Sequence, residues 1–85
     1  MKVYIVEAVG YEEQEVVAAY SSVSEAQKHV DAANKELEEI VKKYTQGRNY
    51  EKFYNAIDNS KLIAGRSWAR VFEYEEIEVK EKFEE

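Results

Sequence analysis

Glutamate side chains at alternating positions are the residues of this sequence that are best placed to do chemistry. Glu13 and Glu15 form one such pair near the start of the chain, and Glu76 and Glu78 form another near its end. Alternate residues of an extended strand lie on the same side, about 6.6 Å apart. That distance is of the order of the spacing between neighbouring phosphates on a nucleic-acid strand. Such rows predict a phosphate-like surface that attracts a basic protein by charge.

The acidic residues are concentrated towards the two ends of the chain. Residues 1–20 hold four glutamates and one lysine, and residues 73–85 hold seven glutamates and two lysines. If strands from both segments pair, the two acidic sets lie on one sheet. The residues predicted to bind a partner are Glu12, Glu13, Glu15, Glu73, Glu75, Glu76 and Glu78. The same acids also fit a simpler interpretation, because charges at a strand edge prevent aggregation.

A basic and aromatic segment offers a second candidate site. Arginine beside stacking aromatic rings can hold a nucleotide or a single-stranded base. The alternative nucleotide-binding residues are Arg48, Lys52, Arg66, Trp68 and Arg70. The same pattern also arises when the aromatic rings belong to the core and the cations balance the acidic ends.

Reactive groups are scarce. The chain has no cysteine and a single histidine, His29, and its three glycines are isolated from one another. Thiolate metal sites, imidazole clusters and glycine-rich phosphate loops are therefore excluded. We expect His29 to lie exposed, or packed at an edge, on the polar flank of a helix. The sequence predicts a protein that is not an enzyme, with no cofactor and no metal site.

The first half of the chain predicts a hairpin followed by a long helix. Residues 2–9 and 14–20 are rich in β-branched residues, and the short connection makes the two strands antiparallel. Apolar residues then recur at steps of three and four over residues 23–45, the pattern of one helix face. Ser22 and Glu25 have the spacing of a capping box at its start.

The second half predicts a short helix and a long strand. Asn49 can cap a helix over residues 49–59, and Gly47 can end the helix before it. Residues 66–79 are predicted to form a strand with apolar residues at both odd and even positions, which indicates a bulge or bend near Glu75. Residues 80–85 are polar, and we expect this tail to fray.

These elements predict a single α+β domain over residues 1–85, in the order ββααβ. The simplest arrangement is a three-stranded antiparallel sheet with the long amphipathic helix across one face and one short helix. The other face of the sheet then needs a cover, which the short helix or a second copy of the chain can supply. A small domain without disulfides usually needs another source of stability, such as a second subunit, so we expect a homodimer.

The charge of the chain also bears on its partners. The net charge of −6 argues against direct binding of nucleic acid, which requires a basic surface. It favours a positively charged partner, or simple solubility. The N-terminal apolar run before Glu7 is too short for a signal peptide or a membrane span, so we expect a cytoplasmic protein that does not bind membranes.

Four segments of the chain resemble a group of small, acidic, uncharacterised bacteriophage proteins. They are Lys2-Val3-Tyr4-Ile5-Val6, Val16-Val17-Ala18-Ala19-Tyr20-Ser21-Ser22, Glu25-Ala26, and Glu75-Glu76-Ile77-Glu78-Val79. The resemblance covers about half of the chain and includes no catalytic motif. It implies a phage accessory protein of the host-takeover or anti-defence type, working in the host cytoplasm.

Some small acidic phage proteins mimic DNA and block a basic host protein such as the histone-like protein HU. The resemblance therefore implies an inhibitor that binds such a host protein through its carboxylate rows. Two other classes remain open. One is an anti-defence sponge that sequesters a nucleotide without cleaving it, and the other is a structural or assembly accessory protein.

Overall fold

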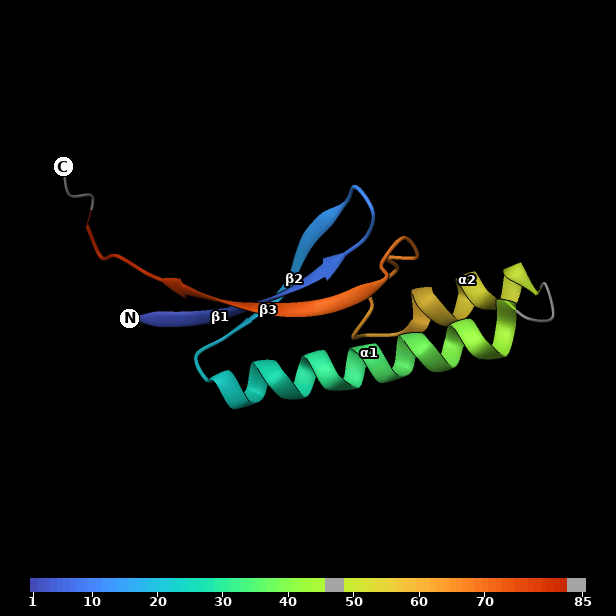
Figure 1. Cartoon of the computed structure of the whole chain (residues 1–85), viewed down its shortest axis with the longest axis horizontal. Helices are drawn as coiled ribbons and strands as arrows, with labels where there is room; N and C mark the ends of the chain where they lie inside the picture. The colour runs from blue at the N-terminus through green and yellow to red at the C-terminus, as the bar shows by residue number, and fades with distance from the viewer. Residues whose placement is uncertain (46–48, 83–85) are drawn as a thin grey trace.

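The chain folds as an α+β domain with the element order ββααβ, as predicted (Figure 1). The computed structural model describes residues 1–45 and 49–82. The elements are β1 (Lys2–Val9), β2 (Gln14–Tyr20), α1 (Val23–Thr45), α2 (Tyr50–Asn59) and β3 (Val71–Glu78). Residues 80–82 of the predicted tail are exposed and lie outside helix and strand, and the rest of that tail lies outside the described residues.

The three strands form one antiparallel sheet in the order β2-β1-β3. The predicted hairpin of β1 and β2 is confirmed, with Tyr4 opposite Tyr20. On its other side β1 pairs with β3 along its whole length, from Lys2 opposite Glu78 to Val9 opposite Val71. The central strand is therefore β1, and both β2 and β3 are edge strands.

The turn of the hairpin depends on Gly10. Its backbone N–H donates to the carbonyl oxygen of Glu13 at 2.8 Å, which closes the turn. A Cβ atom at position 10 would lie 2.8 Å from the backbone oxygen of Trp68 and 2.9 Å from its ring atom Cε3. Only glycine therefore lets the segment before β3 pack this closely against the turn.

The predicted bulge near Glu75 is wrong, because β3 pairs with β1 in an unbroken register. The irregularity lies on the other side of the sheet, where Val6 is opposite Ala18 but Glu7 is opposite Val16. Val17 is thus an extra residue in β2, and it reverses the alternation of the residues before it. Apolar residues occur at both odd and even positions of β3 because the strand has two faces, and not because the strand is interrupted.

The last strand is also shorter than predicted. Residues 66–70 lie outside β3, and the N–H of Ala69 bonds to the carbonyl of Arg66 at 3.0 Å in a turn. Ala64 and Gly65 both have positive φ, 54° and 76°, and redirect the chain before this turn. Trp68 and Ala69 are apolar because they pack against the core from a turn, not because they belong to a strand.

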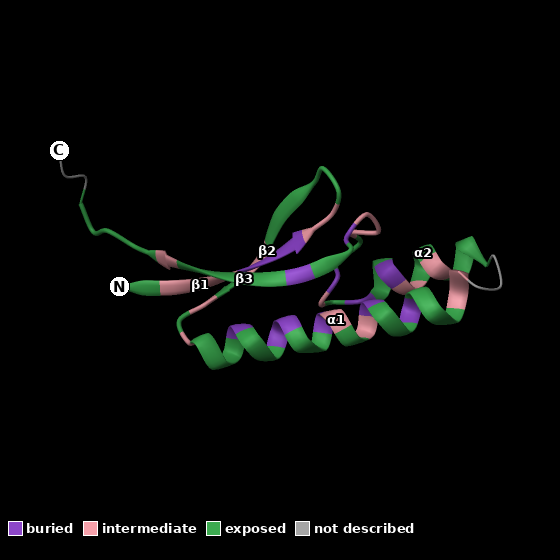
Figure 2. Cartoon of the chain, in the orientation of Figure 1, coloured by how far each residue is buried: buried purple, intermediate pink, exposed green. Residues whose placement is uncertain are grey.

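The main core lies between α1 and one face of the sheet. The sheet contributes Val6, Ala8 and Phe72, and Phe72 is the largest of the fully buried side chains. The buried residues of α1 occur at the predicted three- and four-residue steps, and they are Ala26, His29, Val30, Ala33, Leu37 and Ile40. Figure 2 shows these buried positions on the side of α1 that faces the sheet and α2.

The second helix packs against α1 rather than on the other face of the sheet (Figure 1). Ile57 of α2 is fully buried and joins the same core cluster as Ile40 of α1. Within residues 1–45 and 49–82, the helices therefore lie on one side of the sheet.

The ends of the helices match the prediction in part. The backbone N–H of Lys52 donates to Asn49 Oδ1 at 3.4 Å, so Asn49 caps α2 as predicted. The start of α1 differs from a capping box: Ser22 Oγ lies 2.8 Å from the hydroxyl of Ser24, and Glu25 pairs with Lys28. The predicted stop at Gly47 lies outside the described residues.

Of the two placements expected for His29, exposed or packed at an edge, the exposed one is wrong. The imidazole is buried, with Nδ1 at 2.8 Å from the hydroxyl of Tyr20 and Nε2 at 3.5 Å from the carbonyl oxygen of Leu62. His29 therefore connects the end of β2 to the segment after α2.

Candidate protein-binding face

The side of the sheet opposite the helices carries the candidate site. Residues directly opposite one another in antiparallel strands point to the same side, and successive residues alternate. Since Val6, Ala8 and Phe72 face the helices, their neighbours in sequence face away. We call this surface the open face; it includes Val3, Ile5, Glu7, Val9, Gln14, Val16, Ala19, Glu73, Glu75 and Ile77.

Three carboxylates from two neighbouring strands meet on the open face. Glu7 lies at the middle of the sheet, directly opposite Glu73, while Glu75 is opposite Ile5 and hence diagonal to Glu7. Glu7 is buried, with an exposed fraction of 7%, whereas Glu73 and Glu75 are exposed. From β2, Gln14 Nε2 donates a hydrogen bond to Glu7 Oε2. We call Glu7, Glu73 and Glu75 the acidic triad.

The surroundings of Glu7 disfavour its ionised form. Burial raises the pKa of Glu7 above its ordinary value, and the hydrogen bond with Glu75 raises it further. The negative charges of Glu75 and Glu73 act in the same direction on that pKa. The acidic triad is therefore a place where negative charges are crowded, and a cation placed there would relieve their repulsion.

The acidic triad sits among apolar side chains. Val3, Ile5 and Ile77 are half-buried, and Val16, directly opposite Glu7, is 51% exposed. An exposed apolar patch rimmed by polar groups marks a candidate interaction surface.

The structure divides the acids that the sequence selected. Glu73 and Glu75 lie on the open face, but Glu76 and Glu78 point to the helix side, opposite Tyr4 and Lys2. Lys2 Nζ lies 3.3 Å from Glu76, and a hydrogen bond with this carboxylate, together with its charge, raises the pKa of Lys2. Glu78 is 3.6 Å from the N-terminal amino group. These two carboxylates therefore already have cations beside them.

The remaining three acids lie elsewhere. Glu15 also faces the helix side, opposite Ala8, and Arg66 bonds both of its oxygens at 3.0 and 3.2 Å. Glu12 and Glu13 belong to the turn before β2 and are exposed. The seven predicted residues therefore do not share one surface, and the pairing of Glu13 with Glu15 along a strand does not form.

The sequence-based selection missed Glu7, the residue at the centre of the acidic triad. A signal was present, because Glu7 alternates with the apolar residues Val3, Ile5 and Val9 along the same side of the strand. That signal gains meaning only when β1 is known to be the central strand, because only then does Glu7 have acidic neighbours on β3.

The described nucleotide-binding candidates contact different partners within the protein. Arg66 is held by Glu15, and the guanidinium carbon of Arg70 lies 3.9 Å from the centre of the Tyr11 ring. Trp68 is half-buried against the turn at Gly10. Lys52 is exposed in the first turn of α2, and Arg48 lies outside the described residues.

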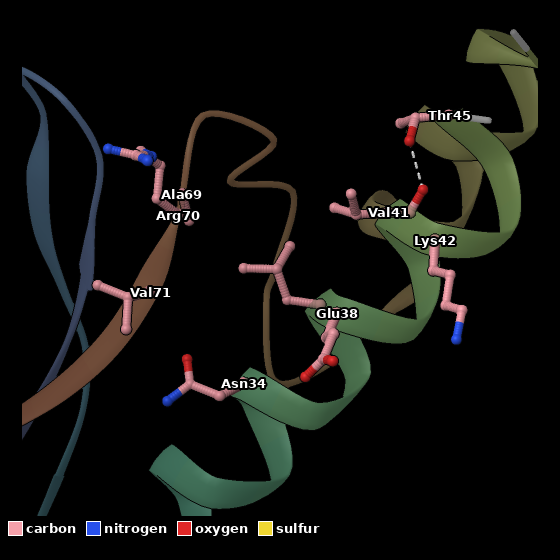
Figure 3. A pocket seen from close by; sticks show the side chains of 9 residues that line it. Asn34, Glu38, Val41, Lys42, Thr45, Ala69, Arg70 and Val71 are labelled. Atoms are coloured by element: carbon pink, nitrogen blue, oxygen red, sulfur yellow. Dashed lines mark hydrogen bonds between the residues drawn. The ribbon is translucent and has the colours of Figure 1, made fainter.

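A groove of about 730 Å³ runs between α1 and the start of β3 (Figure 3). Its lining combines apolar and oppositely charged side chains, namely Asn34, Leu37, Glu38, Val41, Lys42, Thr45, Ala69, Arg70 and Val71. Arg70 is the member of the described nucleotide-binding set that lines it. A phosphate would therefore meet Glu38 as well as Arg70 and Lys42, so the groove does not offer the concentrated positive charge that a nucleotide site needs.

The part of the chain that the structure describes comprises residues 1–45 and 49–82. Within these ranges, no group of three or more histidine, aspartate or glutamate side chains is arranged to hold a metal ion. No helix there combines the length and apolar character needed to cross a bilayer. Comparisons of the chain with protein-family models, with curated proteins and with solved structures give no match.

Proposed function

We propose that this protein is a non-catalytic binding module that presents its open face to a basic protein. The observation that carries the proposal is the acidic triad: Glu7, Glu73 and Glu75 gather among apolar side chains on the sheet face that the helices leave uncovered. The carboxylates take the place of phosphates, and the partner is a protein that normally binds nucleic acid through a basic surface.

The physical basis is relief of repulsion. In the free protein, Glu7 is buried beside two like charges. An arginine or lysine of the partner would form charge-assisted hydrogen bonds with carboxylates that now repel each other. The long-range field of a protein with a net charge of −6 would also steer a basic partner into place.

A basic partner fits the open face better than a second copy does. If two open faces packed together about a twofold axis, the acidic triads would meet near the centre of the interface. Like charges in a buried interface are costly unless they are neutralised. At neutral pH the open face therefore favours a cationic protein over a homodimer.

Occupation of a basic surface would make the protein an inhibitor of nucleic-acid binding. This role is the phage-type inhibitor of a host protein that the sequence suggests, with its contact residues moved to the acidic triad. HU is a suitable probe because it is a basic protein that binds the charged backbone of DNA.

The test compares two variants of equal net charge. One is Glu73→Lys/Glu75→Lys on the open face, and the matched control is Glu39→Lys/Glu51→Lys on exposed positions of α1 and α2. Binding to HU is measured by calorimetry at low salt and at about 0.15 M salt, with double-stranded DNA as a competitor. We expect the open-face variant to lose at least about tenfold in affinity, equivalent to about 1.4 kcal/mol, and the control to lose much less.

An equal loss in both variants would show that only net charge matters and would contradict the open face as the site. Undiminished binding by Glu73→Lys/Glu75→Lys would contradict the proposal altogether. Wild-type protein that binds HU without displacing DNA would contradict the proposed inhibition.

A further inference from the structure

The outer edge of β3 has backbone groups that β1 does not use. Asn34 of α1 shows their direction, because Asn34 Oδ1 accepts from the N–H of Phe72 at 2.7 Å and Nδ2 donates to its carbonyl oxygen at 3.1 Å. The backbone groups of Phe72 therefore point away from β1. In an antiparallel strand the backbone N–H and C=O groups of every second residue point to the same side. The backbone groups of Tyr74 and Glu76 therefore point away from β1 as well.

This edge is accessible beyond Phe72. Residues 73–76 are all exposed, and Figure 2 shows β3 exposed along most of its length, with one buried band at Phe72. The second helix packs on α1 and does not cover β3. Asn34 thus occupies the backbone groups of the edge at Phe72, and those of Tyr74 and Glu76 remain accessible to another strand.

The charge of β3 selects the kind of strand that can pair there. Four of its eight residues are glutamates, two on the open face and two on the helix side. A second copy of β3 in antiparallel pairing would place glutamate beside glutamate, which is unfavourable. A strand with lysine or arginine at alternate positions would instead place each cation beside Glu73 and Glu75.

We propose that β3 binds an extended, cationic segment of the partner as a fourth strand of the sheet. This inference rests on the proposed function and states the form that the partner takes at the open face. Backbone hydrogen bonds to Tyr74 and Glu76 provide the pairing, and alternate cationic side chains contact the acidic triad.

The experiment uses two synthetic peptides of identical sequence, with lysine and threonine alternating. In one peptide every central amide is N-methylated, which preserves the charge but removes the hydrogen bonds of a strand. Affinity is measured by fluorescence anisotropy, and amide hydrogen exchange in the full chain is followed by NMR. We expect the unmodified peptide to bind at least about tenfold more tightly and to slow exchange at Tyr74 and Glu76.

Equal affinity of the two peptides, with both lost in Glu73→Lys/Glu75→Lys, would overturn strand addition but leave charge-based binding at the open face intact. Slower exchange in β2 instead of β3 would overturn the choice of edge. A lysine peptide that binds no better than an all-threonine peptide would also overturn the inference, and the HU measurement would then decide the proposed function separately.

Discussion

Glu7 shows how one residue can have opposite effects on stability and on binding. Its carboxyl lies in the central strand, where burial and the neighbouring Glu73 and Glu75 raise its pKa. The protonated carboxyl suits this site, and the ionised one does not. At neutral pH the folded protein therefore carries a cost at Glu7, which a cationic partner would remove.

The Glu7→Gln variant tests this cost. Because the folded-state pKa of Glu7 is raised, its protonated form stabilises the fold fully below the unfolded-state pKa, and this stabilisation is lost as the pH rises through the folded-state pKa. Glutamine keeps the shape without the charge. We expect the free energy of unfolding at pH 7 to rise by about 0.2–1 kcal/mol, with a smaller gain near pH 4, as measured by urea denaturation.

Glu12→Gln in the exposed turn is the control, and it should change stability little at either pH. An equal gain for Glu7→Gln at both pH values would show that the gain does not come from the carboxylate charge. A loss of stability at pH 7 would show that Glu7 is stabilised in its ionised form.

At the scale of elements, local patterns predicted the helices and the hairpin well. The bounds of α1 match the periodic apolar stripe over residues 23–45, and Asn49 caps α2 as its residue type predicts. Both features depend on neighbours three or four residues away in the sequence. Apart from the capping box at Ser22 and Glu25, which did not form, the parts that failed depend on contacts between distant segments.

The segment 66–70 is one such failure. Its apolar residues resemble a strand, but Trp68 packs against Gly10, more than fifty residues away, and Ala69 belongs to the core. The composition of the candidate site failed for a related reason. The sequence located acidic strands, but the order β2-β1-β3 and the extra Val17 decide which carboxylates share a face, and neither is encoded in a local pattern.

The link between α1 and β3 gives a prediction at this scale. In Asn34→Leu, the N–H and C=O of Phe72 lose their partners beside the core. We expect the free energy of unfolding to fall by about 1–3 kcal/mol, because groups that are left without a hydrogen bond carry their desolvation cost. Urea denaturation measures the loss, and hydrogen exchange at Phe72 should become faster.

Asn55→Leu, at an exposed position of α2, is the matched control and should shift stability by no more than about 0.5 kcal/mol. If Asn34→Leu is as stable as the control, the amide bonds to Phe72 do not fix β3 to the helix.

The whole molecule is long and flat, with extents of 55 × 25 × 18 Å. Helices cover one side of the three-stranded sheet (Figure 1). The other side carries apolar side chains around Glu7, Glu73 and Glu75. A homodimer through this side would gain apolar burial but would bring like charges together. Its stability should therefore depend on the protonation of Glu7, whose pKa is raised.

We expect self-association to increase as the pH falls from 7 to about 4.5, because the raised pKa of Glu7 makes this group take up a proton early. Analytical ultracentrifugation measures the fraction of dimer. The variant Glu7→Gln/Glu73→Gln/Glu75→Gln should form the dimer already at pH 7.

Acidic proteins also associate non-specifically near their isoelectric point, so a second triple variant is needed. Glu12→Gln/Glu13→Gln/Glu51→Gln removes the same charge at exposed positions away from the open face. Equal dimer content in the two triple variants at pH 7 would show that the acidic triad does not control association.

The extra residue in β2 has a consequence for the chemistry of the open face. With regular alternation from Ala18, Glu15 would lie on the uncovered side and Gln14 would face the helices. The insertion of Val17 exchanges the sides of Gln14 and Glu15. The amide of Gln14 therefore donates to Glu7, and the carboxylate of Glu15 bonds to Arg66 on the helix side. A single inserted amino acid thus sets the number of carboxylates on the open face and places a neutral donor among them. A change in the length of β2 could therefore alter the attraction of this face for cations without replacing any residue.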